Sequence, residues 1–292
     1  MTKLLENKKA IITGANQGLG LEIAQKYVLA GASVCICARN EGKLAHAKQH
    51  LEAFLGAGQE ILSVGADVSR SEDVDDVVRR AGDRFGRIDI LVNNAGIYGP
   101  KGTVDDVDWQ EWARAMEINL NGSVLMCRAV LPHMKRQRKG KIVQLSGGGA
   151  TKPLPRLSAY AVSKAAVVRF AETLAEEVRE YNIDVNAIAP GSLNTRMLQE
   201  ILEAGPAAVG KEFYDGAVEQ AERGGTPLQK GADLAVFLAS SLSDGITGKL
   251  IAAVWDPWLS LGEHKEDLQS SDIYTLRRIL PKDRGKKWGS DQ

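Results

Sequence analysis

One tyrosine and one lysine in this sequence are spaced for acid–base chemistry. Tyr160 and Lys164 are four residues apart, so on a helix their side chains share a face. A phenol with its ordinary pKa of about 10 exchanges protons poorly at neutral pH, whereas a neighbouring ammonium group favours the phenolate and lowers that pKa. No other tyrosine is followed by lysine at the fourth position. The pair therefore predicts a group that exchanges a proton with an alcohol or a carbonyl.

A glycine-rich turn near the N-terminus is typical of a dinucleotide site. Gly14, Gly18 and Gly20 lie in TGANQGLG, directly after a β-rich run and before a helical pattern. Such a turn lets the backbone approach a pyrophosphate, whose charge the helix N-terminus stabilises. The spacing is GxxxGxG, not GxGxxG, so the prediction rests on the order of strand, turn and helix.

The end of the second expected strand indicates which dinucleotide is bound. NAD-binding domains place an acidic residue about 20 residues after the glycines to hold the ribose. Here the sequence reads Ala38-Arg39-Asn40. A guanidinium binds phosphate through two N–H groups, so Arg39 favours the 2′-phosphate of NADP(H). In the alternative, NAD is the cofactor and Arg39 is a solvated charge that stacks on adenine.

Short runs rich in valine and isoleucine alternate with helical patterns along the chain. Several runs are almost wholly apolar, as expected of strands buried on both faces of a parallel sheet. The alternation predicts an α/β fold of Rossmann type, doubly wound, with a seven-stranded parallel sheet between two helical layers. The expected strands are 8–13, 33–38, 61–66, 88–94, 141–146, 183–189 and 249–254, and the clearest helices are 19–31 and 165–181.

The same pattern predicts one domain over residues 1–256, followed by a C-terminal extension over 257–292. Residues 191–232 carry helical pieces broken by glycine and proline, which is typical of a substrate lid, although a plain crossover is the alternative. Because 257–280 contain an apolar cluster that includes Trp258, we expect this part to pack on the body or on a neighbouring subunit. The last ten residues are expected to be loose.

Composition excludes several classes of partner. The 292 residues are 44% hydrophobic and 25% charged, with 37 basic and 37 acidic side chains. Zero net charge gives no electrostatic reason to expect nucleic acid or an anionic membrane. No apolar run approaches a membrane span of about 20 residues, and no signal peptide is expected. Three cysteines and four scattered histidines predict neither a disulfide framework nor a metal site. We therefore expect a cytoplasmic protein that acts on a small molecule.

Taken together, the motifs resemble those of the short-chain dehydrogenases/reductases, over about residues 6–255. The resemblance implies an NADP(H)-dependent oxidoreductase that interconverts a secondary alcohol and a ketone, with Tyr160 as the acid/base, usually as a homotetramer or dimer. The motifs that carry it are TGANQGLG, Asp67-Val68, Asn93-Asn94-Ala95-Gly96, Asn119, Tyr160 with Lys164, and Pro190-Gly191 through Thr195.

The resemblance also implies a role for each residue. Lys164 would bind the ribose hydroxyls, and Asn119 would hold a water in a proton relay to solvent. The expected catalytic residues are Asn119, Ser146, Tyr160 and Lys164. The expected cofactor-binding residues are Gly14, Asn16, Gln17, Gly18, Leu19, Gly20, Arg39, Asp67, Val68, Asn94, Ala95, Gly96, Tyr160, Lys164, Pro190, Gly191, Leu193 and Thr195.

The serine of this pattern is displaced by one residue. The family usually has a serine 13 residues before the tyrosine, but position 147 is glycine and Ser146 lies 14 before. Either the turn has one extra residue and Ser146 orients the substrate, or the hydroxyl is missing. The three glycines 147–149 can take positive φ and would absorb an insertion cheaply. Ser158 is better explained as a helix N-cap.

The substrate class is less well specified. Lys152, Arg156 and Arg196 flank the catalytic loop and the lid, and the lid has few aromatic residues. These features favour a polar or anionic small molecule, such as a sugar-like one. Because the serine is displaced, a dinucleotide-binding regulator without efficient turnover is the alternative function.

Overall fold

The expected fold is confirmed: all seven strands join one parallel sheet. The strands are β1 (Lys9–Thr13), β2 (Ser33–Ala38), β3 (Ile61–Gly65), β4 (Ile90–Asn93), β5 (Gly140–Leu145), β6 (Ile183–Ala189) and β7 (Leu250–Ala252). The computed structural model describes residues 3–288, and in it the strand order is β3-β2-β1-β4-β5-β6-β7. The order reverses between β1 and β4. Ligands of such sheets bind beside this point, at the carboxyl ends of the strands.

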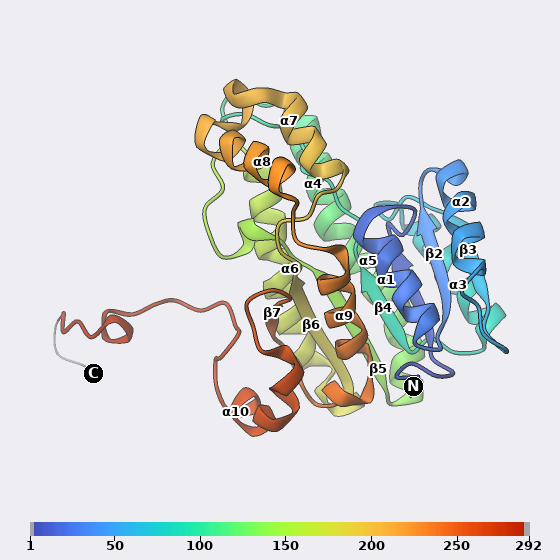
Figure 1. Cartoon of the computed structure of the whole chain (residues 1–292). Coiled ribbons are helices and arrows are strands. Elements are labelled where there is room, and N and C mark those ends of the chain that lie inside the picture. The colour runs from blue at the N-terminus through green and yellow to red at the C-terminus, as the bar shows by residue number, and fades with distance from the viewer. Residues whose placement is uncertain (1–2, 289–292) are drawn as a thin grey trace.

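Helices cover both faces of the sheet (Figure 1). One layer is formed by α1 (Gly18–Leu29), α2 (Glu41–Glu52) and α9 (Leu228–Ala239). The other is formed by α3 (Ser71–Phe85), α5 (Gly122–Gln137) and α6 (Ser158–Glu177). Cys35 and Cys37 point from β2 to the same face and are buried under this second layer, as their spacing predicts.

Residues 191–232 include two helices at the carboxyl end of the sheet. Figure 1 shows α7 (Arg196–Val209) and α8 (Lys211–Arg223) stacked above α6 and α4 (Trp109–Met116). The chain bends within α7 at Gly205, whose φ is 75°. Apolar side chains of both helices pack against the start of α6 in a small separate core, formed by Leu157, Leu198, Ile201, Val209 and Ala217. The inserted helices thus cover the end of the sheet where a ligand would bind.

The first part of the C-terminal extension packs on the body. A 3-10 segment, Trp258–His264, and α10 (Lys265–Ser270) follow the last strand. Leu261 and Leu268 are buried in the core under α9, and the ring of Trp258 packs against Phe237 at 5.6 Å. The extension is therefore attached through apolar contacts.

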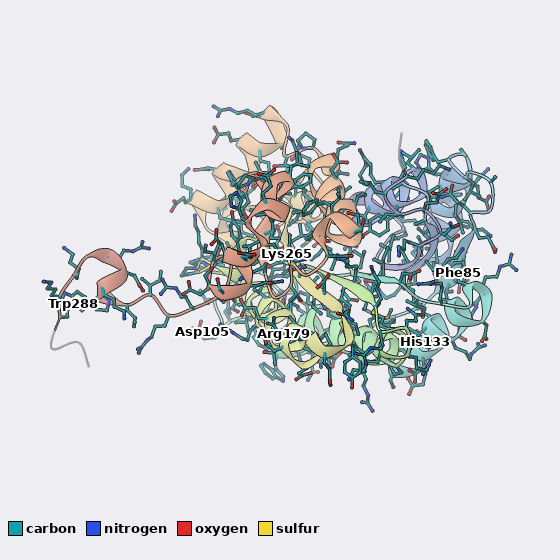
Figure 2. The ribbon with its side chains drawn as sticks, turned by 90° about the horizontal axis from the view of Figure 1, so that it is seen from below. Phe85, Asp105, His133, Arg179, Lys265 and Trp288 are labelled. Carbon is teal, nitrogen blue, oxygen red and sulfur yellow. The ribbon has the colours of Figure 1, made fainter. Side chains whose placement is uncertain are left out.

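Hydrogen bonds continue this attachment as far as Leu276. The Leu276 amide donates to a Glu172 carboxylate oxygen at 2.6 Å, and the Arg169 guanidinium donates to the Leu276 carbonyl. Beyond this point the chain leaves the body as an arm, and Figure 2 shows Trp288 well clear of the domain. Residues 289–292, part of the segment expected to be loose, lie outside the described residues.

Two further expectations concern membranes and metals. Within residues 3–288, no helix combines the length and the apolar character that crossing a membrane requires. The same residues contain no group of three or more His, Cys, Asp or Glu side chains arranged to hold a metal ion.

Two truncations should separate the attached part of the extension from the arm. Removing 257–292 should lower Tm by on the order of 10 °C, because burial of Trp258, Leu261 and Leu268 stabilises by roughly 1.5–3 kcal/mol each. Removing only 277–292 should change Tm by less than about 2 °C, because this segment makes few contacts with the body. Thermal unfolding followed by circular dichroism checks both, and equal Tm values for the two truncations would contradict the assignment.

Candidate active site

A cleft of about 1870 Å³ opens at the carboxyl ends of the central strands. All of the site residues expected from the sequence line it, with the exception of Asn119. The structure therefore brings together residues from the glycine turn at one end and from the lid at the other. Asn119 is only 1% exposed and lies behind the cleft wall.

The glycine turn forms a cradle at the start of α1. Gly14 and Gly18 have φ of 64° and 59°, a region that favours glycine. A Cβ on Gly20 would lie 2.5 Å from the Gly14 carbonyl oxygen and 2.4 Å from Asn94 Nδ2, so the close packing requires a residue without one. Gln17 precedes the helix without capping it through its side chain, which leaves first-turn amides for an anion. This cradle fits a pyrophosphate.

The floor of the cleft is held by contacts between β1 and the loop after β4. Asn94 Nδ2 donates to the carbonyls of Thr13 and Gly14 at 2.9 and 3.1 Å. In return, Thr13 Oγ1 accepts from the backbone amides of Asn94 and Ala95, each at 3.0 Å. These bonds fix the NNAG segment across the point where the strand order reverses.

Two cations lie at the adenosine end of the cleft. Arg39 is exposed at the end of β2, and Lys43 lines the cleft one helical turn later. Lys43 Nζ donates to Gln17 Oε1 at 3.1 Å, while Asn40 Oδ1 caps α2 by accepting from the Lys43 amide at 2.8 Å. Sequence reasoning missed Lys43, which lies in the first turn of the helix that follows Arg39.

Asp67 is a charged group in the wall beside them. It accepts from the Ser69 hydroxyl at 2.6 Å and from the Ser69 amide at 3.0 Å, and it pairs with Arg114. Burial alone would raise its pKa, but the Ser69 hydrogen bonds and the Arg114 charge hold the pKa of Asp67 below its ordinary value. Asp67 therefore keeps its negative charge next to Val68 at the expected adenine position.

Tyr160 and Lys164 lie on one face of α6, in its first turns. Lys164 Nζ donates to the Leu145 carbonyl at 2.7 Å and lies 5.8 Å from the centre of the Tyr160 ring. Burial lowers the pKa of Lys164 to about 8. Burial, and next the nearby Tyr98 phenol, raise the pKa of Tyr160 above its ordinary value. The expected lowering of the tyrosine pKa by the lysine is absent here, because burial and Tyr98 both act in the opposite direction.

Ser146 directly follows β5 and precedes Gly147, the residue that adjoins the Tyr160 hydroxyl. Its amide donates to the Ile188 carbonyl at 2.8 Å, and its buried Oγ has no hydrogen-bond partner among the described residues. The next residue, Gly147, lies so close that a Cβ there would be 2.2 Å from Tyr160 Oη. None of the glycines 147–149 uses the positive φ that glycine allows, and φ of Gly147 is −172°. The unpartnered Ser146 hydroxyl is free to bond a water or a ligand.

Asn119 lies in one π-helical turn, Glu117–Asn121, between α4 and α5. Such turns are frequent at functional sites. Its Oδ1 accepts from the Ile97 amide at 2.8 Å, and its Nδ2 donates to the Ile97 carbonyl at 2.8 Å and to Ser163 Oγ at 2.9 Å. Asn119 therefore connects the loop after β4 to α6.

Ser158 also connects two helices, and its expected role as an N-cap is wrong. The N-cap position is Leu157, and α6 begins at Ser158. Ser158 Oγ accepts from Trp112 Nε1 at 3.1 Å. The hydroxyl therefore joins α4 to the first turn of α6.

The segment after β6 closes the nicotinamide end. Gly191 has φ of 94°, and a Cβ there would lie 2.8 Å from Thr226 Oγ1. Leu193 forms an isolated parallel bridge with Thr226. Thr195 faces the glycine turn, with its Cγ2 3.6 Å from the position of a Cβ on Gly18. The two ends of the expected cofactor site thus meet across the cleft.

Comparisons with known proteins agree with this arrangement. Residues 8–205 match the family model described as short chain dehydrogenase. The chain belongs to the short-chain dehydrogenase/reductase family. It is 34% identical over 247 residues to dehydrogenase/reductase SDR family member 4 of Caenorhabditis elegans, covering 84% of this chain and 93% of that one. It is 36% identical over 241 residues to L-fucose dehydrogenase of Oryctolagus cuniculus, covering 81% and 80%.

Solved structures of this family are similar throughout. Xylitol dehydrogenase with bound NAD+ has a TM-score of 0.76 at 27% identity, covering 85% of this chain and 98% of that one. Levodione reductase has a TM-score of 0.78 at 26% identity, covering 89% and 99%. This short-chain dehydrogenase/reductase is therefore an oxidoreductase of a family that uses NAD(P).

Of the three basic residues that favoured a polar or anionic substrate, two line the cleft and both are engaged by protein groups. Arg156 and Arg196 line the cleft, but Arg156 donates to the Ala207 carbonyl at 2.9 Å and Arg196 pairs with Glu200 at 3.2 Å. Lys152 is not among the lining residues. The side chains around Tyr160 are mostly apolar or aromatic, and they include Tyr98, Leu154, Leu198, Ile201, Leu202, Val209 and Phe213.

Tyr98 was also missed by sequence reasoning. Its ring tilts against that of Tyr160, with the ring centres 4.7 Å apart. Burial, with a smaller contribution from Glu200 of the lid, raises the pKa of Tyr98 to about 12. Its phenol therefore stays protonated at neutral pH. The signal available in the sequence was its position, because Tyr98 lies two residues after Gly96, the last residue of the NNAG segment.

The Tyr160–Lys164 pair should set the pH dependence of the enzyme. Since burial lowers the pKa of Lys164 to about 8, the pair gives up its first proton near that pH. Alcohol oxidation needs a site that can accept a proton, so its kcat/KM should rise with pH and level off above about 8, whereas that of ketone reduction should fall over the same range. Steady-state pH profiles in both directions check this. A midpoint near the ordinary lysine value of about 10.4 would contradict it.

Proposed function

We propose that this protein is an NADP(H)-dependent oxidoreductase that interconverts a secondary alcohol and a ketone, with Tyr160 as the acid/base. The observation that carries the proposal is that the Tyr160–Lys164 pair lines the same cleft as the glycine cradle, with Ser146 and its unpartnered hydroxyl also among the lining residues. Oxidoreductase activity follows from the family, which argues against the alternative of a regulator without turnover.

The residues present fit a dinucleotide phosphate. Gly14, Gly18 and Gly20 would hold the pyrophosphate at the start of α1, and Arg39 and Lys43 would hold the 2′-phosphate. Two cations at this end, without a free carboxylate directly after β2, support NADP(H) over NAD. When bound, the nicotinamide supplies or accepts the hydride.

The chain's own residues manage the proton and the carbonyl oxygen. In ketone reduction the oxygen develops negative charge, and Tyr160 donates its proton to it. The Ser146 hydroxyl donates a hydrogen bond to the same oxygen, which gives that buried group the partner it lacks within the chain. Both donors are fixed before the reaction, because Ser146 ends a central strand and Tyr160 lies in a helix packed on it.

Lys164 and Asn119 complete the proposed proton path. The Lys164 ammonium loses a proton more readily than an ordinary lysine, so it can restore the proton of Tyr160. A Cβ on Gly96 would lie 3.6 Å from Lys164 Nζ and 3.2 Å from Asn119 Oδ1, which shows that both groups approach the same point of the loop. A water held near Asn119 would connect this point to solvent.

Three remaining expectations enter the proposal with different support. The expectation of a polar or anionic substrate is weakened, because Arg156 and Arg196 already have protein partners. A cytoplasmic location and assembly into a dimer or tetramer are retained as proposals, on the composition and on the resemblance to the family.

Turnover with a panel of ketones tests the reaction. The wild-type enzyme should oxidise NADPH while it reduces a ketone to a secondary alcohol. Tyr160→Phe should lose at least about a hundredfold in kcat, and Ser146→Ala about tenfold, because each removes a donor to the carbonyl oxygen. Tyr181→Phe, the same change outside the cleft, is the matched control and should keep normal turnover. Near-normal activity of Tyr160→Phe would overturn the proposal.

Cofactor binding tests the role of the two cations. Arg39→Ala and Lys43→Ala should each weaken NADPH binding about tenfold and NADH binding less than about threefold, because only NADPH carries the 2′-phosphate. Lys48→Ala removes an exposed cation on the same helix, paired with Glu52, and serves as the control. Titration of cofactor fluorescence gives the Kd values. Unchanged NADPH affinity in Arg39→Ala would rule out its phosphate role.

A further inference from the structure

The three glycines between β5 and α6 occupy three different environments. Gly147 adjoins the catalytic tyrosine, Gly148 is exposed in the cleft, and Gly149 is buried against α6. None has positive φ, so backbone conformation does not explain why glycine stands at all three positions. The space available to a side chain does distinguish them.

Gly147 and Gly149 are close-contact positions. A Cβ on Gly147 would meet Tyr160 Oη at 2.2 Å and Tyr160 Cζ at 3.0 Å. A Cβ on Gly149 would meet the backbone of Ala161 at 2.6 Å. Real Cβ atoms do not approach so closely, so a side chain at 147 would displace the tyrosine, and one at 149 would displace the start of α6. The usual family serine position is therefore incompatible with the place that Tyr160 takes in this chain.

Gly148 differs from both neighbours. No heavy atom lies within 4 Å of a Cβ built on it, and the residue lines the cleft. A side chain there would fit without strain and would project into open space in the cleft. Gly148 therefore leaves cleft volume free one residue after the position that adjoins the Tyr160 hydroxyl, without any requirement from packing.

The surroundings of the Tyr160 hydroxyl indicate what this volume accepts. Leu154, from the loop that follows the glycines, lines the cleft together with Leu198 and Phe213 of the lid. These side chains, with Tyr98, pack in the apolar cluster around Tyr160. Burial of apolar substrate surface against these side chains stabilises binding by about 25 cal/mol per Å². A branched or cyclic hydrocarbon group beside the carbonyl would gain most from it.

We propose that Gly148 is a specificity-determining position that leaves room for a branched or cyclic apolar group next to the reacting carbonyl, while Gly147 is a positioning residue for Tyr160. The inference rests on the proposed ketone reductase function. It assigns the enzyme to ketones with a bulky apolar substituent rather than to sugar-like or anionic substrates.

The predicted substrate preference can be measured with two methyl ketones. Methyl cyclohexyl ketone carries a cyclic apolar group, and methyl ethyl ketone a small one. With NADPH, the wild-type enzyme should prefer the cyclohexyl ketone in kcat/KM. Gly148→Val should lower that preference at least tenfold through a higher KM for the cyclohexyl ketone, and should leave kcat for the ethyl ketone within about threefold. Gly262→Val, at another glycine outside the cleft with no contact closer than 3.5 Å, is the matched control.

Gly147→Ala should act differently from Gly148→Val. Because it displaces Tyr160, kcat should fall at least tenfold for both ketones, without the change in preference between them that Gly148→Val causes. If Gly147→Ala fails to fold, Gly148→Val still tests the specificity, because a side chain at position 148 fits into open space. A wild-type enzyme that prefers the ethyl ketone, or an unchanged preference in Gly148→Val, would overturn this inference but not the proposed function. Absence of NADPH turnover with every ketone would overturn the proposed function and the inference with it.

Discussion

The contact between the end of β5 and the start of α6 is the constraint on which the active site depends. Lys164 Nζ donates a hydrogen bond to the Leu145 carbonyl, and the Tyr160 hydroxyl lies against Gly147, two residues further along the chain. The strand is fixed in turn by its register with β4 and β6. A catalytic helix that moved by a fraction of an ångström would lose the alignment of tyrosine, lysine and serine, because positioning errors of this size are costly.

The rest of the cleft uses the same kind of close backbone approach. Gly20 brings α1 against the Gly14 carbonyl and Asn94, and Gly191 lies against Thr226, near the other end of the 191–232 segment. Thr13 and Asn94 hold β1 and the loop after β4 together with four hydrogen bonds. The ends of three separate crossovers are therefore fixed to one another, so that cofactor and substrate sites face each other without relying on flexible side chains.

Sequence reasoning succeeded where the chemistry is local and failed where it depends on tertiary contacts. The glycine turn and the Tyr160–Lys164 spacing are short-range patterns, and the sheet follows from hydrophobic runs, so both could be predicted. The direction in which Lys164 points could not, because it depends on the Leu145 carbonyl supplied by another element. The pocket was expected to be polar from Arg156 and Arg196, yet their partners come from the lid, whose fold the sequence left open.

Burial at this site opposes the ionisation that the tyrosine–lysine spacing alone favours. It lowers the pKa of Lys164 and raises that of Tyr160, so before cofactor binds, the lysine titrates first and the phenol stays protonated at neutral pH. In the proposed mechanism, this protonated tyrosine supplies the proton to an incoming carbonyl oxygen. Alcohol oxidation requires the opposite state, in which the pair has lost a proton. The apolar wall that would bind the substrate therefore also biases the site toward ketone reduction at neutral pH, since the same exclusion of water causes both effects.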